Sequence, residues 1–186
     1  MQITLVRHGK PDHSGTKWLS PREMMEWVEG YQKADVLCRK LPADLVELAS
    51  SAGVLVCSSL SRCMQSLNHL AGERPYTCDK TFAEAHLPGF DLPWPKLPVK
   101  MWRLMLRSAW FLGLSTHTES IFASNRRAKQ AADKLIALAQ EHGSVLLMGH
   151  GIMNVLIAHH LRKQGWAGPL HLILKDFWHP TVYRKA

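Results

Sequence analysis

The sequence lacks several features that mark membrane, secreted or zinc-binding proteins. No apolar run in its 186 residues approaches the roughly 18 residues of a membrane-spanning helix. The chain begins with a strand-like run, without the basic stretch and apolar segment of a signal peptide. No C-x-x-C pair and no zinc-ligand spacing occurs among the four cysteines, Cys38, Cys57, Cys63 and Cys78. We therefore expect a cytoplasmic protein without a membrane span, whose thiols pack in the reduced state.

Acidic residues are also scarce relative to basic ones. The chain has 23 Lys and Arg against 15 Asp and Glu, which gives a formal net charge of +8 at pH 7. Such an excess favours anionic partners, which can be nucleic acid, an anionic membrane or small phosphorylated molecules. No run of five or more like charges marks a segment built for a polyanion. We therefore expect a phosphorylated substrate and no nucleic-acid partner.

Strand-like and helix-like segments alternate along the chain. Apolar runs predict buried strands at 2–6, 53–57 and 144–148, and weaker runs predict strands at 76–78, 170–174 and 181–183. Helices are predicted at 20–40, 43–51, 58–71, 119–142 and 152–162. A capping box of Ser20 and Glu23, with Pro21 at the first helical position, opens the first of them. This order predicts a three-layer α/β/α fold with a mostly parallel central sheet, in a single domain over 1–186.

The stretch 87–118 departs from this alternation. It is rich in proline and then becomes basic and apolar over 100–111, as is typical of an insertion or a lid. Helical spacing relates four of its residues, which are Trp102, Met105, Leu106 and Ala109. Three interpretations fit them: core packing, a Met- and Trp-lined lid that selects an apolar-tailed phosphoester, or a basic amphipathic helix at a membrane surface.

Three of the predicted strands end in polar turns. These are Arg7-His8-Gly9, the turn 58–62, and Gly149-His150-Gly151. Because parallel strands bring their carboxyl ends to one edge of the sheet, we expect the turns to meet in one crevice. Arg offers a planar fork to phosphate oxygens, and neutral imidazole offers a nucleophilic lone pair. A helix that starts after His150 would direct backbone N–H groups to the same place. The three turns together indicate a phosphate-handling site.

The same segments resemble the histidine phosphatase superfamily, which contains phosphoglycerate mutases and histidine acid phosphatases. Residues 5–9 resemble the family signature, 56–66 the second block with its phosphate-binding Arg, and 147–151 the third block with its second His. The segment 81–84, which ends in Glu84, is similar to the place where many members carry their acid. The resemblance covers most of the chain apart from the insertion, and it implies a phosphoglycerate mutase-like fold.

The resemblance implies a role for each of these residues. His8 is the nucleophile that carries the phosphoryl group as a phosphohistidine, and Glu84 is the proton donor. Arg7, Arg62 and an imidazolium at His150 form a cationic pocket. Because that pocket supplies the positive charge that Mg²⁺ supplies elsewhere, neither a metal nor another cofactor is expected.

The continuation after Gly9 departs from the family pattern. Many members have Thr and Asn where this chain has Pro11 and Ser14. Ser14 can still donate a hydrogen bond to phosphate, and Gly151 is a second candidate for substrate binding. By residue type alone, four other carboxylates are alternatives to Glu84 as the proton donor, namely Asp12, Asp79, Asp91 and Glu119.

The leading hypothesis is a metal-independent phosphatase that acts on small phosphomonoesters or on phosphorylated protein side chains. A mutase that returns the phosphoryl group to a sugar acid is an alternative, although the chain is short for the family's mutases. A non-catalytic sensor of a phosphorylated ligand is another, and the intact His8 argues against it because a sensor needs no nucleophile.

Overall fold

The structure, a computed structural model, describes residues 1–13, 18–37, 40–90, 94–170 and 176–186. Its central sheet has the strand order β4-β3-β6-β1-β7. The strands are β1 (Gln2–Arg7), β3 (Val54–Ser58), β4 (Thr77–Asp79), β6 (Ser144–Gly149) and β7 (Pro180–Arg184). Neighbouring strands pair in parallel except β7, which runs antiparallel to β1. The predicted α/β class with a mostly parallel sheet is confirmed.

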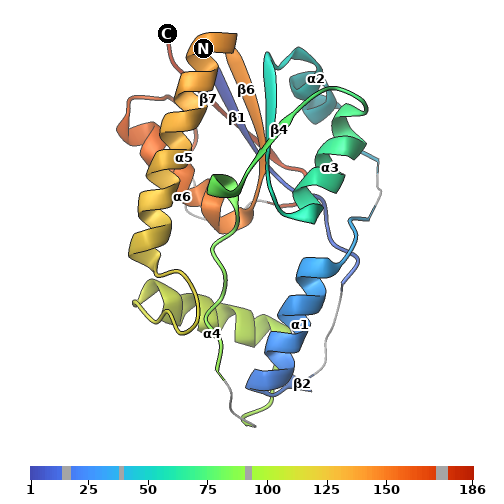
Figure 1. Cartoon of the computed structure of the whole chain (residues 1–186), viewed down its shortest axis with the longest axis vertical. Helices are drawn as coiled ribbons and strands as arrows, with labels where there is room; N and C mark the ends of the chain where they lie inside the picture. Colours follow the sequence, from blue (N-terminus) through green and yellow to red (C-terminus); the bar gives the residue numbers. More distant parts are fainter. Residues whose placement is uncertain (14–17, 38–39, 91–93, 171–175) are drawn as a thin grey trace.

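Helices cover both faces of this sheet. They are α1 (Pro21–Lys33), α2 (Ala43–Ser51), α3 (Ser61–Ala71), α4 (Val99–Phe111), α5 (Ile121–His142) and α6 (Gly151–Lys163), with a short 3₁₀ turn at Lys80–Phe82. In Figure 1, α5 and α6 lie on one face of the sheet, and α2 and α3 lie on the other. The layers are therefore α/β/α. None of the helices within the described ranges combines the length and apolarity needed to cross a membrane.

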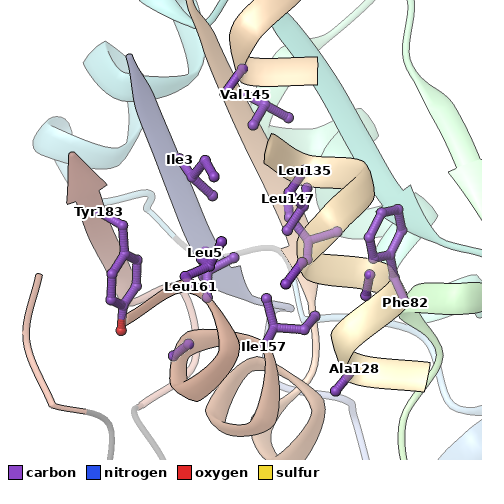
Figure 2. Packing of buried hydrophobic residues seen from close by; sticks show 14 of the residues in the cluster. Ile3, Leu5, Phe82, Ala128, Leu135, Val145, Leu147, Ile157, Leu161 and Tyr183 are labelled. Carbon is purple, nitrogen blue, oxygen red and sulfur yellow. The ribbon is translucent and has the colours of Figure 1, made fainter. Parts of the chain in front are cut away.

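The alternation of side chains along β6 explains why the sheet needs both helical layers. Val145 and Leu147 pack on the α5/α6 side, where Leu135 is fully buried (Figure 2). Leu146 and Met148 point to the opposite face and pack against α2 and α3. A strand buried on both faces has a continuous apolar sequence, which is what 145–148 shows. Burying each such side chain stabilises the fold by about 1.5–3 kcal/mol.

The predicted elements are mostly present, with changed ends. The capping box of α1 is formed, since the hydroxyl of Ser20 accepts from the backbone of Glu23 at 3.3 Å and the Glu23 carboxylate accepts from the backbone of Ser20 at 2.7 Å. The prediction that this helix reaches residue 40 is wrong: it ends at Lys33, and the chain then becomes extended so that Val36 bridges to Pro11. The strand predicted at 170–174 lies almost entirely outside the described residues.

The segment 87–118 contributes one short strand and one helix. Its strand β5 (Leu97–Pro98) pairs with β2 (Trp18–Leu19), and its helix α4 lies with α1 beyond the carboxyl ends of the parallel strands (Figure 1). Trp102 and Leu106 of α4 are buried together with Met24 of α1.

The prediction that Trp102, Met105, Leu106 and Ala109 lie on a helix is confirmed, but they do not all belong to its buried face. The buried residues of α4 are Val99, Trp102, Leu106 and Trp110, at intervals of three and four residues, whereas Met105 is 44% exposed. Core packing is therefore the role of one face of α4, and the rest of the helix is free for other contacts.

Candidate active site

The three predicted turns meet at the carboxyl end of the sheet. The backbone N–H of His8 donates to the carbonyl of Gly149 at 3.0 Å, which joins the ends of β1 and β6. The N–H of Gly9 donates to the hydroxyl of Ser66 at 2.8 Å, and that hydroxyl donates to the carbonyl of Arg62 at 2.6 Å. Glycine is required at position 9, because a Cβ there would overlap the side chains packed against it. Backbone contacts thus bring His8, Arg62 and the turn before α6 together.

The hydrogen bonds of His8 define its tautomer. Its Nδ1 lies 2.7 Å from the carbonyl oxygen of Gly9, and because a carbonyl only accepts, Nδ1 carries the proton. Its Nε2 accepts a hydrogen bond from Nε of Arg62 at 3.2 Å. The ring is 3% exposed, and burial, followed by the charge of Arg62, lowers the pKa of His8 to about 3. At neutral pH His8 is therefore an uncharged imidazole with its lone pair on Nε2.

Two guanidinium groups flank this imidazole. Arg62, in the first turn of α3, is 3% exposed, and its Nη1 is buried with no hydrogen-bond partner among the described residues. Its guanidinium carbon lies 5.7 Å from the ring centroid of Tyr31 in α1. Arg7 lies 4.1 Å from the ring centroid of Phe177, and burial lowers its pKa. Aromatic faces therefore hold both cations next to His8.

His150 lies behind His8, away from solvent. The two ring centroids are 5.2 Å apart, and the side chain of His150 is 0% exposed. Its Nε2 is 2.8 Å from the hydroxyl of Ser58 and 3.3 Å from Sγ of Cys63. Burial, followed by the charge of Arg62, lowers the pKa of His150 well below its ordinary value. His150 is therefore a neutral imidazole in this structure, in place of the expected imidazolium.

Glu84 is held at the start of α6. Its Oε1 accepts from the backbone N–H groups of Ala85 at 3.0 Å and Met153 at 3.1 Å, and its Oε2 accepts from Ile152 at 3.3 Å. The sequence predicted that the N–H groups of this helix would point at phosphate. Two of them instead donate to the carboxylate, which suits the positive end of the helix dipole.

The other candidate acids lie elsewhere or have partners of their own. Asp79 pairs with Lys134 at 2.5 Å, and Glu119 pairs with Arg127 at 2.5 Å. Burial raises the pKa of Asp79, but hydrogen bonds from Lys134 and Thr81 outweigh it and lower the pKa to about 2. Asp12 is exposed at the surface, and Asp91 and Ser14 lie outside the described residues.

A cavity of about 330 Å³ opens in front of His8. Five of the residues predicted for the site line it, namely Arg7, His8, Arg62, Glu84 and Gly151. Sequence reasoning did not anticipate the rest of its wall, which includes Trp27, Tyr31 and Gln32 of α1, His86, and Lys100, Arg103 and Arg107 of α4. The sequence does contain a pattern that predicts part of this wall: Lys100, Arg103 and Arg107 follow one another at intervals of three and four residues, which places them on one side of a helix. Within the described ranges, no group of three or more His, Cys, Asp or Glu is arranged to hold a metal ion.

Comparison with known proteins agrees with this geometry. The sequence profile of the histidine phosphatase superfamily (branch 1) matches residues 3–176. The chain belongs to the histidine phosphatase superfamily. No curated protein matches it in sequence.

Several solved structures of phosphatases share the fold of this superfamily member. A mycobacterial glucosyl-3-phosphoglycerate phosphatase has a TM-score of 0.60 at 19% identity, over 97% of this chain and 88% of its own. The α-ribazole phosphatase of Shigella flexneri has a TM-score of 0.60 at 17% identity, over 98% and 89%. A phosphoserine phosphatase of Entamoeba histolytica has a TM-score of 0.59 at 15% identity, over 97% and 89%. At these identities the likeness establishes the phosphoglycerate mutase-like fold.

Proposed function

We propose that this protein is a phosphatase that hydrolyses phosphomonoesters through a phosphohistidine on Nε2 of His8. The observation that carries the proposal is the state of His8. Its proton is on Nδ1, its lone pair is on Nε2, and its low pKa keeps that lone pair available. A neutral imidazole held beside two guanidinium groups is suited to attack phosphorus.

In the first step, Nε2 of His8 attacks phosphorus and the bond from phosphorus to the ester oxygen breaks. For this attack to occur, Arg62 has first turned its donors from Nε2 to the phosphoryl oxygens as the substrate binds, which frees the lone pair, and its buried Nη1, which has no hydrogen-bond partner among the described residues, donates to one of those oxygens. Arg7 supplies a second fork. Glu84 acts as the general acid in this step and gives a proton to the departing oxygen, which leaves as an alcohol.

In the second step, water attacks phosphorus and the bond between phosphorus and Nε2 breaks. The Glu84 carboxylate takes a proton from the water, which restores the acid and releases inorganic phosphate. The hydrogen bond from Nδ1 of His8 to the Gly9 carbonyl holds the ring in the same orientation through both steps. The guanidinium groups carry the positive charge of the site, so the reaction is metal-independent.

Hydrolysis of p-nitrophenyl phosphate tests this function. We expect release of phosphate that persists in EDTA and is lost in the His8→Ala variant. Retained turnover by His8→Ala would rule out the mechanism. Formation of an isomer from a phosphorylated sugar acid, without free phosphate, would show a mutase instead.

A further inference from the structure

The face of α4 that lines the cavity is cationic. Lys100, Arg103 and Arg107 lie on the cavity wall, at positions that share one side of a helix. Like charges at these spacings repel one another, and Lys100 in the first turn also opposes the helix dipole. None of the three forms an ion pair with a carboxylate in the described part of the chain. A helix that is locally unfavourable in this way is typical of a functional surface.

The helix that carries these charges is anchored near both ends. Nε1 of Trp102 donates to the carbonyl of Leu19 at 2.6 Å, and Nε1 of Trp110 donates to the carbonyl of Glu119 at 2.9 Å. Both indole rings are buried. The helix that carries the cations is therefore placed in advance of ligand binding, which lowers the entropy cost of binding.

Arg107 shows that this face is prepared for an anion. Its Nη2 donates to the carbonyl of Ala85 at 2.9 Å, next to Glu84, and its guanidinium carbon lies 4.9 Å from the ring centroid of Trp110. Its Nη1 is buried and has no hydrogen-bond partner among the described residues. A buried donor of this kind is costly unless a ligand satisfies it.

The charge of the cavity exceeds what one phosphoryl group neutralises. The described residues of its wall include a single carboxylate, Glu84, and five cationic side chains, which are Arg7, Arg62, Lys100, Arg103 and Arg107. Arg7 and Arg62 flank His8 and suffice for the transferred phosphoryl group. The charges on α4 then face the rest of the substrate.

We propose that the substrate carries a second anionic group, a carboxylate or a phosphate, on the part that leaves, and that Lys100, Arg103 and Arg107 bind it. This inference rests on the proposed phosphatase function and narrows its substrate class. For α4 itself it favours recognition of an anion over recognition of an apolar tail, because the α4 residues on the cavity wall are three cations and a single apolar side chain, Leu104.

Matched substrates test the inference. O-phosphoserine and O-phosphoethanolamine differ by one carboxylate, and glucose 1,6-bisphosphate and glucose 6-phosphate differ by one phosphate. In one of the two pairs, we expect kcat/KM for the more anionic member to exceed that of the other by about tenfold or more. A gain of this size is what one charge-assisted hydrogen bond contributes. The pair that shows the preference identifies the second group as carboxylate or phosphate.

A charge-neutralising variant connects the preference to α4. Arg103→Gln should lower kcat/KM about tenfold for the preferred substrate and much less for the matched substrate that lacks the second anionic group. Arg126→Gln makes the same charge change on an exposed position of α5, outside the cavity, and should retain the preference.

Three results would overturn the inference. The first is equal kcat/KM within both pairs, and the second is an unchanged preference in Arg103→Gln. The third is a preference for a long-chain alkyl phosphate, whose leaving group carries no second charge. Each leaves the phosphatase function intact if p-nitrophenyl phosphate is hydrolysed. If nothing is hydrolysed, the proposed function fails by itself, and the same pairs compared by calorimetric binding to the wild-type protein still decide whether the second anion is recognised.

Discussion

Arg62 donates a hydrogen bond from Nε to Nε2 of His8 across 3.2 Å, and both side chains are almost completely buried. The acceptor of this hydrogen bond is the same Nε2 lone pair that attacks phosphorus in the proposed mechanism. Ser66 links the backbone of Arg62 to that of Gly9, and these two hydrogen bonds hold the first turn of α3 against the turn after β1. Burial, followed by the charge of the same guanidinium, lowers the pKa of His8 and keeps the ring neutral, and the guanidinium also supplies a fork for the phosphoryl oxygens.

Replacing Arg62 by Lys should therefore impair catalysis although the charge is kept. Lys has no planar fork, and it cannot donate to Nε2 and to phosphoryl oxygens in the same geometry. We expect kcat/KM for p-nitrophenyl phosphate to fall about 10²- to 10³-fold, as on removal of a preorganised donor. Arg126→Lys, an equal change on the surface of α5, is the control. Nearly wild-type activity in Arg62→Lys would show that a point charge suffices.

Replacing Glu84 by Gln should affect poor leaving groups most. The amide keeps the shape of the side chain but cannot protonate the departing oxygen. For an alkyl phosphate we expect kcat to fall about 10²- to 10⁴-fold, with a much smaller loss for p-nitrophenyl phosphate, whose leaving group needs little protonation. Asp79→Asn removes the alternative carboxylate and should leave kcat for both substrates nearly unchanged. A reversed result for the two variants would assign the acid to Asp79.

The buried imidazole of His8 should make the protein less stable in mild acid. Its pKa is about 3 in the folded protein and about 6.5 when unfolded, so below pH 6.5 the unfolded chain binds the additional proton. The free energy of unfolding should therefore fall as pH decreases, by about 1.4 kcal/mol per unit for this group. Urea unfolding at pH 7.5 and 5.5 measures it, and His8→Gln should lose about 1 kcal/mol less than the wild type. An equal loss in both proteins would mean that His8 is not held neutral.

The position of α4 should depend on the indole N–H of Trp102. Trp102→Phe keeps a buried ring but removes the donor to the carbonyl of Leu19. We expect a loss of about 1–2 kcal/mol in the free energy of unfolding, since the carbonyl is left without its partner. Trp18→Phe is the matched control, because the side chain of Trp18 is 63% exposed and should change stability little. Equal effects of the two substitutions would contradict the anchoring role.

The parts of the site that could be predicted from the sequence are those set by local pattern. The strand before His8 and the strand before His150 are continuous apolar runs, and parallel pairing alone then brings their ends together. The capping box at Ser20 was also readable, because both of its partners lie within one helical turn. These features depend on neighbours in the sequence and on one rule of sheet geometry.

The remaining features depend on contacts between distant segments. The first N–H groups of α6 donate to Glu84 because the chain after β4 passes that helix, which no local pattern records. The neutral state of His150 follows from complete burial beside Ser58, whereas the sequence shows only a His after a strand. The cationic wall exists because Trp102 and Trp110 anchor α4 over the site. The spacing of the charges in the sequence shows that they share one side of a helix, but only this packing shows that the side faces the cavity.

The most direct test of the account is to trap the phosphohistidine on His8. The protein is mixed with substrate, quenched in alkali, in which phosphohistidine survives, and digested for mass spectrometry. We predict that the peptide containing Arg7-His8-Gly9 gains the mass of one phosphoryl group, and that the gain is absent without substrate. Continued release of phosphate with no modification of this peptide, or with the phosphoryl group on another residue, would contradict the account.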